Sequence, residues 1–301
     1  FLCCFILFTV VSSLLSRQVT VFIALRSAHL SFIQQMTRAV LRIALVIAFV
    51  WLGALGIFSS CTLAIVIALI IGNLILMRRE PGYRPLPAIQ KSVVSKIGHF
   101  SAVNYIAQIM ASATVYLLSL MVINTLGSEM NAYFYIAYTI ATFLFTISGF
   151  VMMSLFVEGS YEPQKLFLNI TKAVRLTFAL LIPAIIIIFL WGDKILLLFG
   201  SQYSQSAFAL LKVLSLASIP LAFNSLYRTV KRVQLELKPI IYVQSGLAFS
   251  VLGGGYLLMK PMGLMGVGVG QLLGRGLVAL VVGVVMLRRM GWARFAASAR
   301  K

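Results

Sequence analysis

The sequence predicts an all-α integral membrane protein, folded as a polytopic helical bundle. Hydrophobic residues make up 61% of its 301 residues and charged residues 10%. Its mean hydropathy is +1.03. The apolar residues are gathered in separate stretches, and about 20 such residues in a helix cross the hydrocarbon core of a bilayer. These three observations point to membrane-spanning helices rather than to a soluble core.

Nine stretches are long and apolar enough to be transmembrane helices. They run over residues 1–24, 34–53, 59–77, 98–122, 130–155, 171–191, 206–226, 238–259 and 263–287. Pro183 and Pro220 fall inside two of these stretches. Proline removes a backbone donor and clashes with the preceding turn, so both positions predict kinks.

Basic residues near the helix ends predict the orientation. The formal net charge is +19, and most of the Lys and Arg residues lie in every second connection and in the C-terminal segment. The intervening connections hold Lys194 and Lys260. Because cytoplasmic loops carry the excess of basic residues, we expect a multi-pass protein of the plasma (inner) membrane with a cytoplasmic C-terminus. This distribution explains the charge better than nucleic-acid binding does.

An internal repeat predicts two bundles in parallel orientation. Each copy reads as a basic helix end, an apolar helix, a glycine turn, a second apolar helix and an Arg-Arg pair. In the first copy these landmarks are Arg26, Gly56 in LGALGIF, and Arg78-Arg79. In the second copy they are Arg232, Gly263 in MKPMGLM, and Arg288-Arg289. Same-orientation repeats of this kind relate the halves of many transporters.

The repeat also predicts how the chain is divided. Three further helices precede the second copy, so symmetry predicts twelve helices in two six-helix bundles. Residues 1–79 would be the last three helices of the N-terminal bundle, and 80–97 a cytoplasmic linker. Residues 98–290 would be the six-helix C-terminal bundle, and 291–301 a basic cytoplasmic tail. The first copy lacks the three helices that precede the second, so we expect that three N-terminal helices are missing. The chain also begins with Phe1 and shows no signal peptide.

The stretch GLMGVGVGQLLGRGLVAL at 263–280 is rich in glycine. It lacks the lysine and the flanking strand of a phosphate-binding loop, which argues against that interpretation. Gly266, Gly270 and Gly274 recur every four residues and form one ridge of a helix. Such a ridge predicts close approach of a neighbouring helix.

Arg275 is the main candidate for a functional residue. It lies 12 residues from either end of the 263–287 segment, which is about 18 Å and near the bilayer midplane. A charge there is unfavourable by roughly 2.5–3.5 kcal/mol on insertion scales, so it should face a cavity or a partner. Gln271 lies one turn away on the same face. The alternative is a structural arginine bonded to backbone carbonyls.

Other polar residues inside the predicted helices are weaker candidates. Asn104 and Gln108 begin a stripe that continues through Ser112 and Tyr116, and this stripe could line a wet cavity or bond a neighbouring helix. For the stripe Tyr135, Thr139, Thr142 and Thr146 we expect bonds between helices. Arg17 and Lys212 lie nearer to helix ends, where they could face a cavity or extend toward the interface.

Carboxylates are missing from the predicted helix interiors. The six acidic residues map to connections or helix ends: Glu80, Glu129, Glu158, Glu162, Asp193 and Glu236. A cation or proton antiporter normally needs an intramembrane carboxylate, whereas interior arginine and lysine suit an anionic substrate. We find no catalytic constellation, metal-ligand spacing or cofactor motif, and we read Cys3, Cys4 and Cys61 as packing residues.

Several stretches resemble membrane proteins of polysaccharide biosynthesis. These are GSQYSQSAFALLKVLSLASIPLAFNSLYRTVKRVQ at 200–234, VFIALRSAHLSFIQQ at 21–35 and GLMGVGVGQLLGR at 263–275. They are similar to O-antigen-type flippases of lipid-linked oligosaccharides, in the superfamily that includes the multidrug and toxin exporters (MATE). The resemblance implies two six-helix bundles around a cavity. It also implies alternating access and an isoprenoid-diphosphate-linked glycan as substrate, and it assigns no individual residue.

The sequence therefore favours a flippase that is not an enzyme. In it Arg275 would contact the diphosphate, and Gln271, Asn104 and Gln108 would make polar contacts. Its partners would be the anionic lipid-linked glycan, the bilayer and other membrane proteins of polysaccharide assembly. Two alternatives remain open: a drug or organic-cation antiporter of the same fold, and a membrane glycan polymerase or ligase.

The predicted orientation can be tested with single cysteines in a chain whose Cys3, Cys4 and Cys61 are replaced by serine. A membrane-impermeant maleimide should label Lys194→Cys in intact cells, because this residue lies in an outer connection. It should label Arg175→Cys only after the membrane is permeabilised. The reverse pattern would invert the topology.

Overall fold

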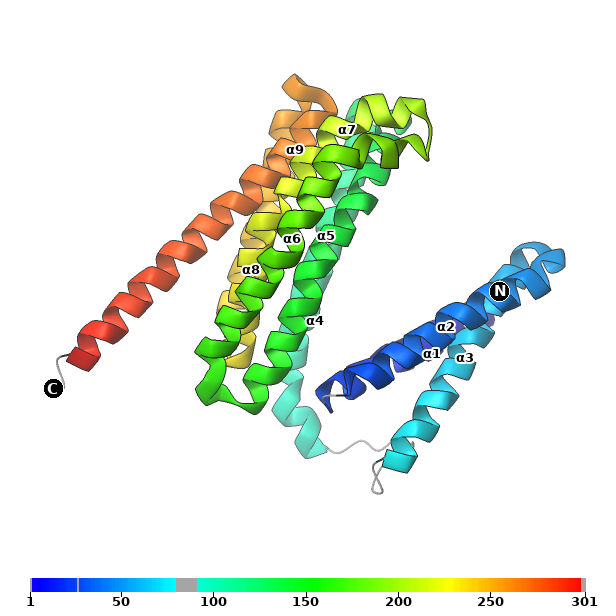
Figure 1. The fold of residues 1–301 in the computed structure, drawn as a ribbon, viewed down its shortest axis with the longest axis horizontal. Coiled ribbons are helices and arrows are strands. Elements are labelled where there is room, and N and C mark those ends of the chain that lie inside the picture. The colour runs from blue at the N-terminus through cyan, green and yellow to red at the C-terminus, as the bar shows by residue number, and fades with distance from the viewer. Residues whose placement is uncertain (1, 26, 80–90, 299–301) are drawn as a thin grey trace. The chain divides into compact units, whose positions relative to one another are not determined.

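The computed structural model describes residues 2–25, 27–79 and 91–298, which contain helices and no strand. The all-α fold class is confirmed. The helices form two compact units, residues Phe1–Gln90 and Lys91–Lys301. Figure 1 shows the course of the chain. Residues 80–90 of the expected linker lie outside the described residues, and α4 already begins at Lys91.

The first unit is a three-helix assembly in which α1 and α2 pack against α3. A 3-10 turn, η1, joins α2 to α3. The bounds are α1 Leu2–Ala24, α2 Ala28–Phe49, η1 Val50–Leu52 and α3 Gly53–Arg79. A small apolar cluster around Leu15, Ile65 and Ala68 holds α1 on α3.

In the second unit α4, α5, α8 and α9 pack in sequence around a ring, while α6 lies outside against α5 and α7. The bounds are α4 Lys91–Leu126, α5 Ser128–Tyr161, η2 Pro163–Lys165, α6 Leu166–Leu197, α7 Ser201–Leu216, α8 Ser218–Val233 and α9 Lys238–Ser298. Fully buried Phe134, Leu181 and Leu214 belong to its largest apolar cluster.

The segment predicted as one helix over 206–226 consists of two helices, α7 and α8. Together they form one apolar stretch, Ser201–Val233, that is long enough to cross a membrane. The break follows from Pro220, which cannot bond the carbonyl of Leu216 four residues earlier, and α7 ends at that residue. The helical run then continues seven residues beyond the predicted end. By contrast, α6 runs unbroken through Pro183.

The predicted helices 238–259 and 263–287 are joined in α9 by a reversal at a single residue. Gly263 has φ 57° and ψ −137°, which is outside the helical region and favours glycine. The first half of α9 (residues 238–262) and its second half (263–298) therefore form a hairpin. In Figure 1 the second half, drawn red, diverges from the other helices of the unit toward its C-terminal end. The helix extends past the predicted end, to Ser298.

The glycine ridge of the second half packs against the first half, as predicted. A Cβ atom on Gly270 would lie 2.4 Å from the backbone nitrogen of Gly255. On Gly274 it would lie 2.8 Å from the carbonyl carbon of Ser250. The Ser250 hydroxyl also donates a hydrogen bond to the carbonyl oxygen of Gly274, at 3.1 Å. Only a glycine allows the two backbones to approach this closely.

The internal repeat is visible in the backbone, with one correction. Gly53 has φ 62° and ψ −140°, close to the values at Gly263. The sequence pattern paired Gly263 with Gly56, but the backbone shows that its counterpart is Gly53. With this pairing the repeat has a constant offset of 210 residues. The equivalent positions are Ala28 and Lys238, where α2 and α9 begin, Gln34 and Gln244, Gly56 and Gly266, and the pairs Arg78-Arg79 and Arg288-Arg289.

The α9 hairpin gives a matched pair of stability variants. Gly270→Ala should lower the free energy of unfolding by roughly 1–3 kcal/mol, since the added methyl group overlaps backbone atoms. Gly276→Ala should have little effect or stabilise slightly, because nothing lies within 4 Å of its Cβ position and alanine favours helix. Thermal unfolding in detergent measures both. Equal midpoints for the two variants would contradict the packing.

Candidate functional site

A cavity of about 180 Å³ lies inside the second unit, between α4, α5, α8 and both halves of α9. Its polar lining comes from Thr114, Tyr138, Arg228, Gln244, Gln271 and Arg275. Apolar side chains, among them Phe145, Leu247 and Val251, close the remaining wall. Two predicted residues, Gln271 and Arg275, are thus brought together on one cavity, one helical turn apart.

Arg275 is held from several sides. Its side chain is 8% exposed, and the guanidinium carbon lies 4.5 Å from the ring centroid of Phe145. The Tyr138 hydroxyl also interacts with the guanidinium. The backbone carbonyl of Arg275 accepts a hydrogen bond of 3.0 Å from Asn224 Nδ2 on α8. These contacts, together with the glycine ridge, fix the helix face on which Arg275 meets the cavity.

Arg228 is a second cationic side chain of this cavity, and the sequence analysis missed it. Its Nη1 donates to Gln244 Oε1 at 2.6 Å, and its Nη2 donates to Ser225 Oγ at 3.0 Å. Arg228 and Arg275 are close enough for their charges to interact. The helix predicted over 206–226 ends before Arg228, which would place this residue among the basic residues of a connection. A helix started by Pro220 would have placed Arg228 inside it.

Several buried polar atoms around this cavity have no hydrogen-bond partner among the described residues. They include both amide atoms of Gln271, Nη1 of Arg275, Nε of Arg228 and Oδ1 of Asn224. Gln271 is fully buried. Unsatisfied buried donors and acceptors are unfavourable, so in the native fold such a cluster is expected to bond a ligand, an ion or water. Three of the unsatisfied groups are donors on Gln271, Arg275 and Arg228.

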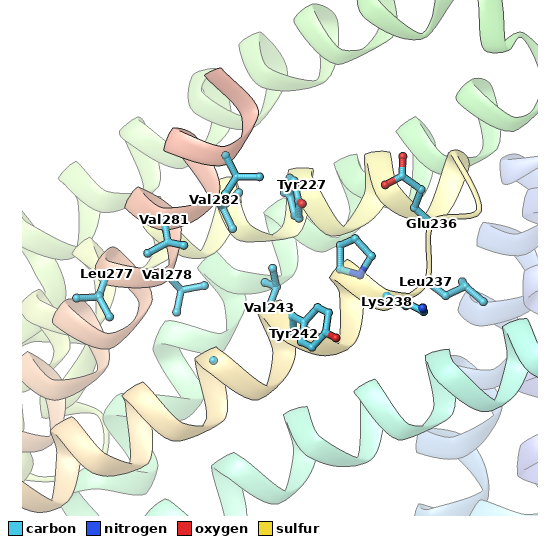
Figure 2. A pocket seen from close by; sticks show the side chains of 13 residues that line it. Tyr227, Glu236, Leu237, Lys238, Tyr242, Val243, Leu277, Val278, Val281 and Val282 are labelled. Carbon is cyan, nitrogen blue, oxygen red and sulfur yellow. The ribbon is translucent and has the colours of Figure 1, made fainter. Parts of the chain in front are cut away.

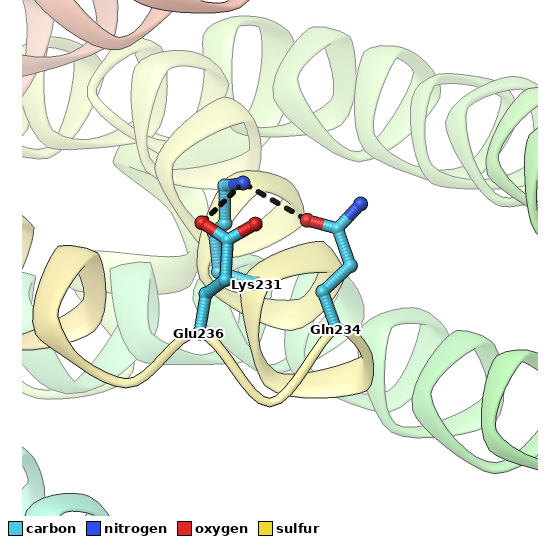
Figure 3. A network of polar contacts seen from close by, with 3 residues as sticks. All are labelled: Lys231, Gln234 and Glu236. Atoms are coloured by element: carbon cyan, nitrogen blue, oxygen red, sulfur yellow. Dashed lines mark hydrogen bonds and ion pairs between the residues drawn. The ribbon is translucent and has the colours of Figure 1, made fainter.

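No carboxylate is among the residues that line this cavity. Described acidic residues make contacts elsewhere: Glu129 accepts a hydrogen bond from the Tyr133 hydroxyl at 2.6 Å, and Glu162 pairs with Lys165 at 2.7 Å. Glu236 pairs with Lys231 at 2.9 Å in the α8–α9 loop, where Gln234 also accepts from Lys231 (Figure 3). The cavity therefore carries two positive charges with no lining counter-ion, and its chemistry suits an oxyanion.

The other predicted candidates lie outside this cavity. Asn104 lies on α4, and its Nδ2 donates to the Phe100 carbonyl of its own helix at 2.8 Å. Gln108 is exposed on α4. Lys212, on α7, lies over the rings of Phe208 and Phe189 at 4.0 and 5.7 Å. Arg17 is exposed on α1 of the first unit.

Within the described residues the threonine hydroxyls of the α5 stripe bond their own helix and not a neighbouring one, contrary to the prediction. Thr139, Thr142 and Thr146 each donate to a carbonyl four residues earlier in α5, at 2.7–2.8 Å. All three side chains are exposed, as is Tyr135. Threonine satisfies its hydroxyl locally in an apolar environment, so a helical stripe of hydroxyls does not by itself indicate a contact.

The first unit holds a neutral counterpart of the Arg228–Gln244 pair. Gln18 and Gln34 stand 210 residues before Arg228 and Gln244, and Gln34 Nε2 donates to Gln18 Oε1. Gln34 also donates to the Ala68 carbonyl at 3.1 Å, and Gln18 donates to Asn73 Oδ1 at 2.9 Å. Gly72 leaves room for both glutamines. The repeat thus preserves the side-chain pairing while its charge differs between the units.

Comparisons with known proteins identify the fold. The sequence matches no protein-family profile, and no curated protein sequence matches it. Solved MATE transporters are similar in structure. A multidrug resistance MATE family transporter of the MOP superfamily, in its outward-facing conformation, has a TM-score of 0.74 at 17% identity over 91% of this chain. An aspartate-to-asparagine mutant of the Vibrio cholerae MATE transporter VcmN has a TM-score of 0.77 at 17% identity over 92%.

A MOP superfamily transporter from Pyrococcus furiosus, whose binding pocket is described as having reverse polarity that suggests a different function, has a TM-score of 0.74 at 17% identity over 91% of this chain. The chain covers 63% of this transporter and of the outward-facing one, and 66% of the Vibrio cholerae protein. It therefore spans less than two thirds of their length. The similarity shows the MATE fold of a multi-pass membrane protein.

Two glutamines of the cavity should respond oppositely to the same substitution. Gln271→Leu should raise the thermal midpoint, because it removes unsatisfied buried atoms that destabilise by about 1–3 kcal/mol. Gln244→Leu should lower it, because Arg228 loses its acceptor. Added pyrophosphate should stabilise the wild type and have a weaker effect on Gln271→Leu. Destabilisation by Gln271→Leu would show that its amide is satisfied in the folded protein.

Proposed function

We propose that this chain is the larger part of an alternating-access membrane transporter that moves an isoprenoid-diphosphate-linked oligosaccharide to the outer leaflet for polysaccharide or O-antigen biosynthesis. The MATE fold supports transport, because the structurally similar proteins carry the name transporter. Its partners are the anionic lipid-linked glycan, the plasma (inner) membrane and other polysaccharide-assembly proteins of that membrane. We propose no enzymatic step.

The observation that carries this proposal is the pair of guanidinium groups in a cavity without a lining carboxylate. Arg228 and Arg275 have unsatisfied donors that can bind phosphate oxygens. A low-dielectric surrounding strengthens such contacts. The Pyrococcus furiosus transporter is described as having a binding pocket of reverse polarity that suggests a different function, which supports a pocket whose polarity differs among proteins of this fold.

In the proposed mechanism the diphosphate displaces Arg275 from the Phe145 ring and receives hydrogen bonds from Arg275, Arg228 and Gln271. The anion neutralises two like charges that otherwise repel each other. We propose that the two arginines approach each other in one of the two transporter conformations only, so that the anion binds that conformation more tightly and shifts the equilibrium toward it. Asn104 and Gln108 are proposed to contact the sugars, and Arg17 and Lys212 to contribute further positive charge along the path.

A drug or organic-cation antiporter of the same fold is the main rival. The multidrug resistance name of one structural neighbour supports it. Such a protein needs a carboxylate for its cationic substrate or for proton exchange, and none lines the described cavity. A membrane glycan polymerase or ligase is a further rival. Catalysis would require an activated nucleophile or an acid–base pair, and the lining of this cavity supplies the hydroxyls of Thr114 and Tyr138 but no histidine, carboxylate, cysteine or lysine to activate them.

The direct test follows the lipid-linked glycan after depletion of the full-length protein in cells. A membrane-impermeant glycan-binding probe should show accumulation on the cytoplasmic face, and re-expression should restore exposure on the outer face. Accumulation of the glycan on the outer face, or no accumulation, would contradict the flippase proposal. Loss of organic-cation efflux on depletion would favour the antiporter.

Arginine variants then test the mechanism in the re-expressed protein. Arg275→Ala and Arg228→Ala should each slow flipping roughly tenfold or more, because a hydrogen bond to a charged group contributes about 1.5–3 kcal/mol. Arg175→Ala is the matched control, since Arg175 is exposed on α6 and does not line the cavity. Membrane insertion should be normal in all three. Unchanged flipping by the cavity variants would remove these arginines from the mechanism.

A further inference from the structure

A second, larger cavity of about 720 Å³ forms an open groove beside the charged one. It is bounded by the end of α8, the start of α9 and the diverging second half of α9 (Figure 2). Leu277, Val278, Val281, Val282 and Val285 line one side. Tyr227, Pro239, Tyr242, Val243 and Gly246 line the other. The groove thus lies within apolar, membrane-spanning helices, and its lining is mainly apolar.

One layer of side chains separates this groove from the cationic cavity. Neighbouring residues line opposite sides: Val243 faces the groove and Gln244 the cavity, and likewise Tyr227 and Arg228. Leu247 of the cavity wall packs in one cluster with Val243 and Val278 of the groove. An apolar chain in the groove and an anion near Arg228 and Arg275 would therefore lie on two sides of the same wall.

The rim of the groove carries a positive charge. Lys231 is 7% exposed and is held by Glu236 and Gln234 (Figure 3), which leaves the rim carboxylate of Glu236 neutralised. Lys238 stands at the same rim in Figure 2, is exposed, and forms no hydrogen bond or ion pair within the described part of the chain. The rim thus has one net positive charge, next to the apolar groove.

We propose that this groove binds the hydrocarbon chain of a polyisoprenyl phosphate lipid, with Lys238 at the phosphate. The inference rests on the proposed function and deepens it: the groove is the place where the substrate's lipid is held. The apolar lining matches a single hydrocarbon chain, and the charged rim matches an anion at one end of it. This lipid is bound before transport: its phosphate at Lys238 lies on the groove side of the wall, and it has to leave Lys238 before it reaches Arg228 and Arg275 on the other side.

Photolabelling tests the groove independently of transport. The full-length protein in nanodiscs is mixed with a polyisoprenyl phosphate that carries a diazirine near the end of its chain. Labelling is expected in peptides that contain 239–246 and 277–285. Val281→Trp should reduce it at least fivefold by filling the groove. Leu280→Trp should not, because Leu280 is an exposed apolar neighbour on the same helix that does not line the groove.

Two further probes define the occupant. The matching polyisoprenol, which lacks the phosphate, should label the wild type severalfold less than the polyisoprenyl phosphate does. In Lys238→Gln the two probes should label the groove about equally. A phosphatidylglycerol with a diazirine on its acyl chain should label these peptides weakly. Equal labelling by phosphatidylglycerol, or equal effects of Val281→Trp and Leu280→Trp, would overturn the proposal. Because labelling needs no flipping, a protein that binds the chain yet moves no glycan would disprove the proposed function alone.

Discussion

The contact between the backbones of Gly254, Gly255 and Gly270 is the constraint on which the second unit depends. It brings the two halves of α9 together so closely that even a methyl group would overlap backbone atoms. Arg275 and Gln271 stand beside this ridge, and their direction into the cavity follows from it. The groove forms where the two halves separate beyond the ridge. One close approach thus positions both the charged cavity and the apolar one.

The sequence predicted the helices and the position of Arg275 on a cavity. Apolar length is a strong signal, because a bilayer leaves the backbone no other way to satisfy its hydrogen bonds. The position of Arg275 could be predicted because an arginine near the midplane is unfavourable unless it faces a cavity or a partner. Arg228 was not predicted, because an error of a few residues in the position of a helix end moves a basic side chain from the helix interior to a loop. The threonine stripe misled for a different reason: a hydroxyl can be satisfied within its own helix.

The two copies of the repeat carry different charges at equivalent positions. In the first unit the equivalent positions hold Gln18 and Gln34, two neutral amides that bond each other and backbone carbonyls. In the second unit one of them is Arg228, and the pair gains a charge and one unsatisfied donor, Nε of Arg228. The sequence pattern located the repeat but misaligned its turn by three residues. Two glycines, at 53 and 56, both fitted the pattern, and only the positive φ of Gly53 decides between them.

The reversal at Gly263 has a consequence for the aqueous face of the membrane at which it lies. Because one residue turns the chain, the hairpin presents almost no polypeptide to water there. A protease that needs an extended segment in its cleft would find none at this point, and an antibody would find little to recognise. At Gly53 the same backbone reversal follows the three exposed residues of η1, so that connection offers more polypeptide to a protease or an antibody.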